Sequence, residues 1–232
     1  MWIKICGNTN LEDAELAVKY GADAVGFVFA ESPRQVTADT VRNITAELPA
    51  AIEKIGVFVD ASFDRIVETV CVAGLTGVQL HFENNAGLAQ RVRENFDAQN
   101  RSGRRLRILQ VLHFDANQNN FGHHLKEVEK DSAIDAILVD SRTATKPGGT
   151  GIAFDWKAAR ESFAREAGHL RLVAAGGLGP ENVTKAIEIL QPWGVDVVTG
   201  VEARPGKKDP ARVKTFIEAA RSAGVQLLAA SC

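Results

Sequence analysis

The stretch "LRLVAAGGLGPENVTKAIEILQPWGVDVVTG", residues 170–200, contains one complete unit of the fold. Leu170 to Ala174 is a short apolar run that predicts a buried strand. A glycine-rich turn leads through Pro180 into Val183 to Leu190, where apolar residues recur at helical spacing. Val195 to Thr199 then predicts a second strand. This order of elements predicts two parallel strands joined by a crossover helix.

The same order of elements recurs along the whole chain. Leu11 to Tyr20 predicts a helix with Asn10 as its N-cap and Gly21 at its end. Pro210 to Ser222 predicts the last helix, which we expect Gly224 to stop. The predicted strands are Trp2 to Cys6, Ala24 to Phe29, Ile52 to Val59, Gly77 to His81, Leu106 to Leu112, Ala136 to Val139, Leu170 to Ala174 and Val195 to Thr199.

Two α/β architectures are compatible with these repeated units: an open doubly wound sheet and a closed barrel. An open sheet of this size would leave two apolar edges to protect, and no break in composition divides the chain. We therefore expect a single (β/α)8 TIM barrel, with a parallel eight-stranded sheet, over residues 1–232. Polar segments near 84–105 and 115–124 predict elaborated loops.

The composition excludes several classes of partner. The 232 residues are 45% hydrophobic and carry a formal net charge of −2, so we expect neither a nucleic acid partner nor a membrane partner. No secretion signal or membrane-length apolar run is seen, which predicts a cytoplasmic location. The cysteines, Cys6, Cys71 and Cys232, are widely spaced and lack companions at ligand spacing, so we expect no disulfide framework and no metal site.

In such a barrel the reactive groups lie at the carboxyl ends of the strands. The first predicted strand ends in Cys6, within "KICGNT", and the sixth leads into Asp140, within "VDSR". Glycine turns after the seventh and eighth strands are typical of phosphate binding through backbone N–H groups. Gly149 lies in the glycine-rich segment Lys146 to Gly151, which we expect to close over the substrate and assist there. The other predicted phosphate-binding residues are Gly176, Gly177, Thr199 and Gly200.

Seven motifs occur in order from Ile3 to Phe216, each in a separate barrel unit: "KICGNT", "GADAVGFVFAESPRQV", "GVFVD", "VQLH", "VDS", "AAGGLGPENV" and "GVDVVTGVEARPGKKD". Together they resemble the phosphoribosylanthranilate isomerase family of tryptophan biosynthesis. The resemblance implies an isomerase that carries out an Amadori rearrangement of a small phosphorylated sugar-anthranilate substrate. It implies no metal and no organic cofactor, and we expect a monomer or a homodimer.

The resemblance also implies roles for three residues. Cys6 matches the family's general base, Asp140 its general acid, and Arg34, in "ESPR", the arginine that binds the anthranilate carboxylate. This reaction needs an acid for the departing ring oxygen and a base for the proton on the second sugar carbon. A carboxyl pKa normally lies near 4 and a thiol pKa near 8.5. We therefore expect the pKa of Asp140 to be raised by burial and the pKa of Cys6 to be lowered.

Strand periodicity predicts a charged pair beneath the site. Lys4 and Cys6 share one face of the first strand, while Ile3 and Ile5 share the other and should face the helices. A lysine inside a barrel needs an anion. The eighth strand lies beside the first in a closed barrel, so we expect Lys4 to pair with Asp196 and its positive charge to support a Cys6 thiolate.

Alternatives to this interpretation stay open at the level of fold. Indole-3-glycerol phosphate synthases, histidine-pathway aminoribonucleotide isomerases and ribulose phosphate epimerases are also phosphosugar barrels, but Cys6 with Asp140 disfavours all three. A barrel that only senses a phosphorylated metabolite is another possibility, because fold does not determine function. Two positions depart from the family pattern: Thr199 replaces a serine, and Phe82 replaces a glycine after "QLH", which removes conformational freedom there.

Overall fold

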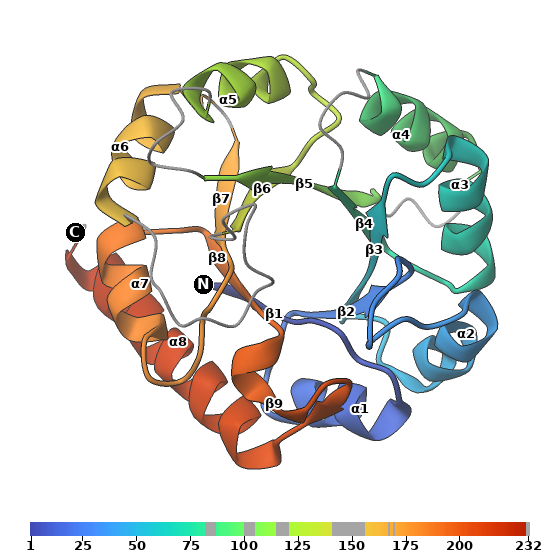
Figure 1. Cartoon of the computed structure of the whole chain (residues 1–232), viewed down its shortest axis with the longest axis horizontal. Coiled ribbons are helices and arrows are strands. Elements are labelled where there is room, and N and C mark those ends of the chain that lie inside the picture. The colour runs from blue at the N-terminus through green and yellow to red at the C-terminus, as the bar shows by residue number, and fades with distance from the viewer. Residues whose placement is uncertain are drawn as a thin grey trace.

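Eight parallel strands close into a barrel in the computed structural model, which describes residues 1–81, 87–99, 105–114, 121–140, 156–166, 168 and 170–230. The strands are β1 (Trp2–Ile5), β2 (Ala24–Val28), β3 (Glu53–Val59), β4 (Gly77–His81), β5 (Arg107–His113), β6 (Ala136–Asp140), β7 (Arg171–Ala174) and β8 (Gly194–Val197). Each strand pairs with the next along the chain, and β8 pairs back with β1. Figure 1 shows the strands as a central ring. The predicted (β/α)8 barrel is confirmed, with strand ends within two residues of those expected.

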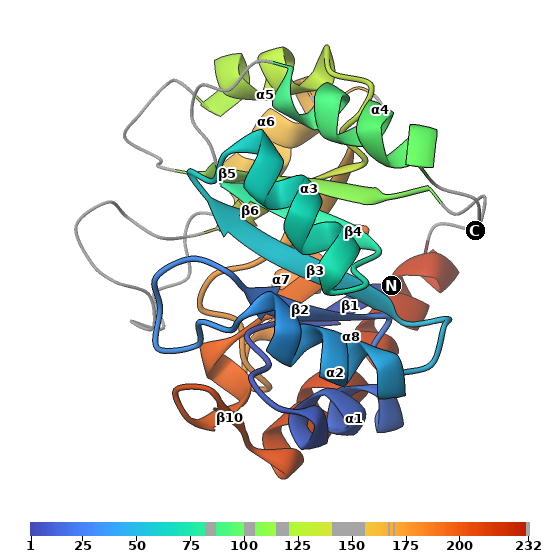
Figure 2. The same cartoon turned by 90° about the vertical axis from the view of Figure 1, so that its right-hand side faces the viewer.

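Helices cover the outer side of the barrel, as Figures 1 and 2 show. They are α1 (Leu11–Lys19), α2 (Ala38–Glu47), α3 (Phe63–Val72), α4 (Leu88–Gln99), α5 (Phe121–Glu129), α6 (Trp156–Glu166), α7 (Val183–Leu190) and α8 (Pro210–Ala230). The predicted N-cap of α1 is confirmed, because the Asn10 side chain accepts the backbone N–H of Asp13 at 3.0 Å. Within the described residues, no helix has the length and apolar character needed to cross a bilayer.

Helix α8 continues through Gly224, so the expected stop at this glycine is wrong. A Cβ atom at position 224 would lie 2.6 Å from the Cβ of Met1. The glycine therefore lets α8 lie directly against the start of the chain, where the Arg221 guanidinium also donates a hydrogen bond to the Met1 carbonyl. A glycine inside a helix costs only about 1 kcal/mol, which this packing can offset.

The polar segment near 84–105 also differs from the expected loop, because residues Leu88–Gln99 form α4. Leu88, Ala89 and Val92 are buried at helical spacing against the barrel, and the polar residues between them face outward. Similarly, α5 begins at Phe121, within the second segment expected to be a loop. Three or four apolar positions are thus enough to anchor a helix in a polar stretch of this barrel.

The pleat of β1 agrees with the sequence. Ile3 and Ile5 belong to the apolar layer between barrel and helices, whereas Trp2 belongs to the cluster inside the barrel. Lys4 lies on the same face as Trp2 and is fully buried. Along β1, the side chain that faces the barrel interior is therefore apolar at Trp2 and charged at Lys4, two residues closer to the carboxyl end of the strand.

A short antiparallel hairpin, β9 (Glu202–Arg204) with β10 (Lys207–Lys208), separates β8 from α8 and was not expected from the sequence. The hairpin is tied to the β1 end of the barrel, where Thr9 donates a hydrogen bond to the Gly206 carbonyl at 2.7 Å. It is also tied to α1, because Asp13 accepts the Lys208 backbone N–H at 2.9 Å. These contacts bring Glu202 and Lys208 to the carboxyl end of β1.

Candidate active site

The two predicted acid–base residues lie at the carboxyl ends of their strands. Cys6 directly follows β1, and Asp140 is the last residue of β6. Both are buried, with exposed fractions of 3% and 5%. The Cys6 backbone is held from two sides, since its N–H donates to the Val197 carbonyl and its carbonyl accepts from Lys208. The strand termini therefore bring a thiol and a carboxyl group to the same rim of the barrel.

The predicted pair below Cys6 is confirmed. Lys4 and Asp196 are register partners across β1 and β8, and the Lys4 Nζ lies 2.8 Å from Asp196 Oδ1. The same Nζ donates a second hydrogen bond to Gln79 Oε1 at 2.7 Å. Burial opposes the charged form, yet the charges of Asp196 and Cys6 raise the pKa of Lys4 overall. Lys4 is therefore an ammonium ion in the floor of the site.

The pKa of the Cys6 thiol is raised, so the expected lowering is wrong. Burial is the largest cause, because it penalises the thiolate. The positive charges of Lys4 and Lys208 act in the opposite direction, but the nearby Asp196 carboxylate adds to the rise. Pairing Lys4 with Asp196 thus cancels much of the field that we expected to stabilise the thiolate.

Gly26 of β2 makes room for the thiol and the ammonium stem. A Cβ atom at this position would lie 2.5 Å from Cys6 Sγ and 2.9 Å from Lys4 Cε. Both side chains therefore touch the same small space beside β2, which places the sulfur next to Lys4. Cys6 is not sealed among aliphatic groups, because its neighbours include two lysines.

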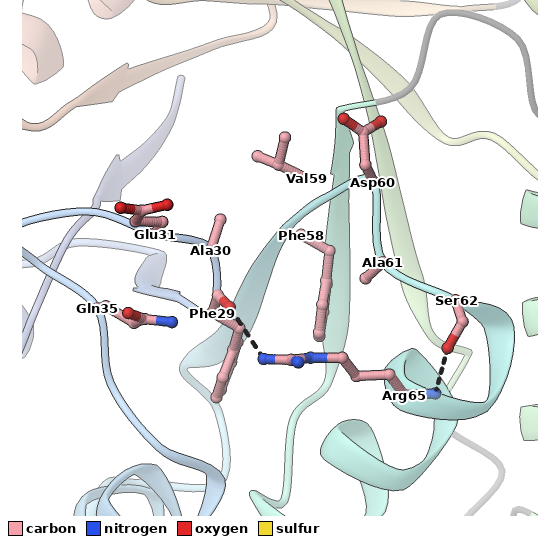
Figure 3. A pocket seen from close by; sticks show the side chains of 10 residues that line it. All are labelled: Phe29, Ala30, Glu31, Gln35, Phe58, Val59, Asp60, Ala61, Ser62 and Arg65. Carbon is pink, nitrogen blue, oxygen red and sulfur yellow. Dashed lines mark hydrogen bonds between the residues drawn. The ribbon is translucent and has the colours of Figure 1, made fainter.

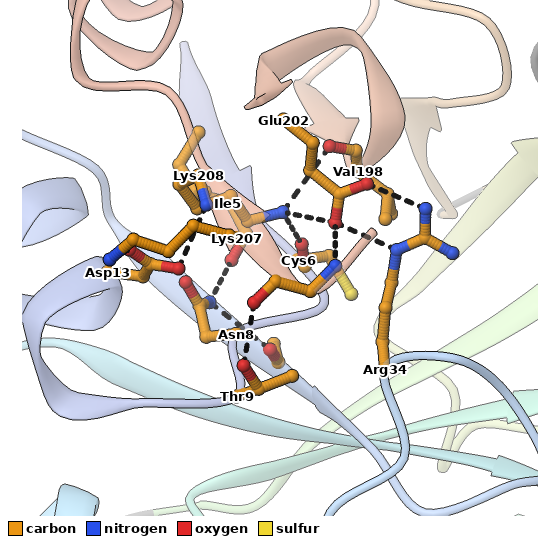
Figure 4. A network of polar contacts seen from close by, with 12 residues as sticks. Ile5, Cys6, Asn8, Thr9, Asp13, Arg34, Val198, Glu202, Lys207 and Lys208 are labelled. Carbon is orange, nitrogen blue, oxygen red and sulfur yellow. Dashed lines mark hydrogen bonds and ion pairs between the residues drawn. The ribbon is translucent and has the colours of Figure 1, made fainter. Parts of the chain in front are cut away.

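Arg34 is held by a carboxylate of the protein. Its Nε and Nη2 donate to Oε1 and Oε2 of Glu202 at 2.8 and 2.6 Å, in a bidentate pair that Figure 4 shows. These hydrogen bonds raise the pKa of Arg34, and the charge of a Cys6 thiolate would raise it further. Among the described residues, the third nitrogen, Nη1, has no hydrogen-bond partner. Binding of the anthranilate carboxylate by Arg34 stays a prediction. The carboxylate would have to approach the edge of the guanidinium that carries Nη1, which we call the free edge.

The predicted phosphate loops meet at the ends of β7 and β8. Gly176 and Gly177 have φ angles of +75° and +64°, which residues other than glycine rarely adopt. Asn182 fixes this turn, since its Oδ1 accepts the Gly179 N–H and its Nδ2 donates to the Gly177 carbonyl, each at 2.9 Å. Gly200 packs against the backbone of the same turn.

Backbone donors are available in both of these loops. Within the described part of the chain, the N–H groups of Gly176, Gly177, Thr199 and Gly200 have no hydrogen-bond acceptor. Thr199 itself is exposed and begins a short 3-10 helix, Thr199–Val201. Unpaired N–H groups at glycine turns form the concave, electropositive surface that binds phosphate in other barrels.

Some predicted residues lie outside the described residues: Gly149 with its segment 146–151, and Phe82.

A cavity of about 580 Å3 lies at the ends of β2 and β3, as Figure 3 shows. Asp60 lines this cavity, whereas the Gln79 side chain accepts a hydrogen bond from Lys4. No group of three His, Cys, Asp or Glu side chains suited to a metal is found in the described ranges.

Comparison with known proteins decides the family. Residues 3–219 match the family model described as N-(5'-phosphoribosyl)anthranilate (PRA) isomerase. The chain belongs to this family. N-(5'-phosphoribosyl)anthranilate isomerases from Rubrobacter xylanophilus and Thermotoga maritima are each 38% identical to it, over 95% and 94% of this chain and 98% of both relatives.

Solved structures of the PRA isomerase family have the same fold. A phosphoribosyl anthranilate isomerase from Thermotoga maritima matches with a TM-score of 0.81 and 35% identity, covering 96% of this chain and 99% of that one. Another, in complex with reduced 1-(o-carboxyphenylamino)-1-deoxyribulose 5-phosphate, matches with a TM-score of 0.75 and 33% identity over the same shares of the two chains.

Sequence reasoning about this PRA isomerase family member missed Glu202, Lys208 and Asn182 as site residues. The dipeptide Pro-Gly in "EARPGKK" is a turn signal between two charged residues and was the available sign of the hairpin. Asn182 lies in "GPEN", directly before α7, and its bonds to the preceding glycine turn are its contribution to the site. Glu202 and Lys208 act through contacts with Arg34 and Cys6, which are distant in sequence, whereas Asn182 acts on the adjacent glycine turn.

Removing the Lys4 charge from the floor of the site should destabilise the fold. We expect Lys4→Met to lower the free energy of unfolding by about 3–5 kcal/mol, because it leaves Asp196 buried without its cation. The double variant Lys4→Met/Asp196→Leu should recover most of this loss. Urea denaturation measures both, with Lys214→Met, in an exposed pair with Glu218, as the control expected to change by less than about 0.5 kcal/mol. A Lys4→Met protein as stable as that control would contradict the buried pair.

Proposed function

We propose that this chain catalyses the Amadori rearrangement of N-(5'-phosphoribosyl)anthranilate to 1-(2-carboxyphenylamino)-1-deoxyribulose 5-phosphate, a step of tryptophan biosynthesis. The observation that carries the proposal is the placement of Cys6 and Asp140 at the carboxyl ends of β1 and β6 in a barrel of this family. A relative in complex with a reduced form of the same product supports it. We place the enzyme in the cytoplasm as a monomer or homodimer; a Thermotoga maritima relative is described as dimeric.

Ring opening and enol formation need one proton transfer each, at the ring oxygen and at C2, which an acid and a base on one rim can supply. Asp140 donates a proton to the ring oxygen as the C1–O bond breaks, and the nitrogen lone pair forms a C1=N iminium. Cys6, as a thiolate, then takes the proton from C2, and the C–H electrons form a C1=C2 bond while the nitrogen recovers its lone pair. The resulting enol becomes the ketone by gaining a proton at C1 and losing one from the C2 hydroxyl.

Two ends of the substrate are charged and need separate binding groups. We propose that the unpaired N–H groups of the Gly176–Gly177 turn and of Thr199 and Gly200 bind the phosphate, with Gly149 contributing from its own segment. The free edge of Arg34 binds the anthranilate carboxylate. With both ends held, the reacting C1 and C2 atoms lie between β1 and β6, where proximity lowers the barrier.

The direct test is the loss of anthranilate-type fluorescence when the purified chain is mixed with N-(5'-phosphoribosyl)anthranilate. We expect saturable conversion to the deoxyribulose phosphate, with the product identified by mass and by its reduction with borohydride. Binding of the substrate without conversion would contradict the proposal and favour a phosphate-sensing barrel.

The raised pKa of Cys6 predicts a pH dependence. Only the thiolate accepts a proton, so in Asp140→Asn, where the acid no longer titrates, the residual kcat/KM should rise with pH, with a midpoint above the ordinary thiol value of about 8.5. Because Lys4 lowers the pKa of Cys6, Lys4→Met should move this midpoint to still higher pH. Initial rates from about pH 6 to 10 test both statements. A kcat/KM of Asp140→Asn that stays constant across this range would contradict a thiol base.

A further inference from the structure

The hairpin after β8 places a buried, charged cluster beside the Cys6 backbone. This cluster, Arg34 with Glu202 and Lys208, is shown in Figure 4. Side chains of Glu202 and Lys208 are exposed by only 3% and 0%, and that of Arg34 by 15%. Charged groups are rarely buried to this extent without a specific role or a complete set of partners.

Glu202 controls the orientation of Arg34. Its two oxygens accept from Nε and Nη2, which fixes the guanidinium plane and leaves one edge of the fork without a protein partner among the described residues. Burial opposes the ionised form of Glu202, but the Arg34 hydrogen bonds and the Lys208 charge hold its pKa below the usual value. Glu202 is therefore a carboxylate, and Figure 4 shows the third nitrogen of Arg34 turned away from it.

Lys208 ties this arrangement to the catalytic strand. Its Nζ donates to the Cys6 carbonyl at 2.5 Å, the Val198 carbonyl at 3.3 Å and Glu202 Oε1 at 3.4 Å. Three acceptors use the three hydrogens of an ammonium group. The chain of contacts from Arg34 through Glu202 and Lys208 thus ends on the backbone of Cys6, and fixes the guanidinium relative to the thiol.

The cluster pairs two basic side chains with one carboxylate, and burial lowers the pKa of Lys208. Arg34 and Lys208 both contact Glu202, at 2.6 and 3.4 Å. Asp13 of α1, which accepts the Lys208 backbone N–H, is already paired with Lys207 at 2.8 Å. The Arg34 guanidinium has one edge with no protein partner among the described residues, and such an edge best fits a planar carboxylate.

Resting on the proposed function, we propose that Glu202 is a positioning residue that determines specificity for the carboxylate on the aromatic ring of the substrate. It does so by aiming the free edge of Arg34, while Lys208 holds Glu202 and Cys6 at a fixed spacing. Glu202 itself does not touch the reacting atoms.

The test compares two substrates: N-(5'-phosphoribosyl)anthranilate and N-(5'-phosphoribosyl)aniline, which lacks the carboxylate. The measured quantity is the ratio of their kcat/KM values. We expect Glu202→Gln, which keeps the shape of the side chain and removes its charge, to lower this ratio by roughly 10- to 100-fold, mainly through the KM of the anthranilate substrate. A merely structural role would lower both kcat/KM values together and leave the ratio unchanged, which would overturn the proposal.

Two further variants keep the test decisive. Glu12→Gln removes an exposed ion pair between α1 and Lys207 of the same hairpin, and it should leave the ratio unchanged. Glu202→Asp keeps the charge and should lower the ratio of kcat/KM values less than Glu202→Gln does. If Glu202→Gln does not fold, Glu202→Asp decides alone. The proposal is then refuted if Glu202→Asp lowers kcat/KM equally for both substrates and so keeps the wild-type ratio. If the wild-type chain converts neither substrate, the proposed function fails; if it converts both and Glu202 variants keep the ratio, only this inference fails.

Discussion

Replacing Cys6 with serine should lower kcat for N-(5'-phosphoribosyl)anthranilate by about 10²- to 10⁴-fold, the usual contribution of a positioned base. A serine hydroxyl holds its proton far more tightly than a thiol, so it cannot take the proton from C2 at neutral pH. The substitution keeps the size and polarity of the side chain in the space beside Gly26 and Lys4. Stopped and continuous fluorescence assays measure kcat and KM, and we expect KM to change little.

Cys71→Ser is the matched control for this variant. Cys71 is exposed on α3 at the outside of the barrel, so its substitution should leave kcat within about twofold of the wild-type value. A Cys6→Ser enzyme with wild-type turnover would remove the base from the mechanism and favour a different proton acceptor.

Asp140→Asn should lower kcat by a similar factor of about 10²–10⁴, because an amide cannot donate the proton that the departing ring oxygen needs. Asp140 is the buried last residue of β6, and asparagine has nearly the same volume, so the fold should be retained. The assay is the same, and circular dichroism with thermal unfolding verifies the fold.

Asp39→Asn provides the control for the loss of one carboxylate. Asp39 is exposed in the first turn of α2 and pairs only at the surface with Arg42, so this change should leave kcat unaffected. Equal activities of Asp140→Asn and Asp39→Asn would show that Asp140 has no part in the proton transfer.

Much of the fold follows from local sequence. Alternation in Trp2 to Ile5 correctly predicts which side chains of β1 face the helices, because a strand has only two faces. The Lys4–Asp196 pair follows from the same alternation once the barrel closes. Gly224 was misread because its neighbour, Met1, comes from the other end of the chain, and no local signal reports that contact.

The site follows from the sequence only in part. Strand ends predict where Cys6 and Asp140 lie, since topology alone brings those ends to one rim. The direction of the Cys6 pKa shift was wrong because it depends on a balance between burial and three charged neighbours. Arg34 was expected to bind the substrate carboxylate, and the sequence gives no sign that Glu202, 168 positions away, holds it. The pKa shift of Cys6 and the partner of Arg34 both depend on contacts that form only when the chain is packed.

The central claim is that Cys6 removes the C2 proton and Asp140 opens the ring. The most direct test is the kinetic isotope effect on kcat/KM with substrate carrying deuterium at ribose C2, measured in Cys6→Ser and Asp140→Asn. Our account predicts a larger isotope effect in Cys6→Ser, where C–H cleavage becomes the slow step, than in Asp140→Asn, where ring opening limits the rate. A larger isotope effect in Asp140→Asn, or equal effects in the two variants, would contradict the assignment of base and acid.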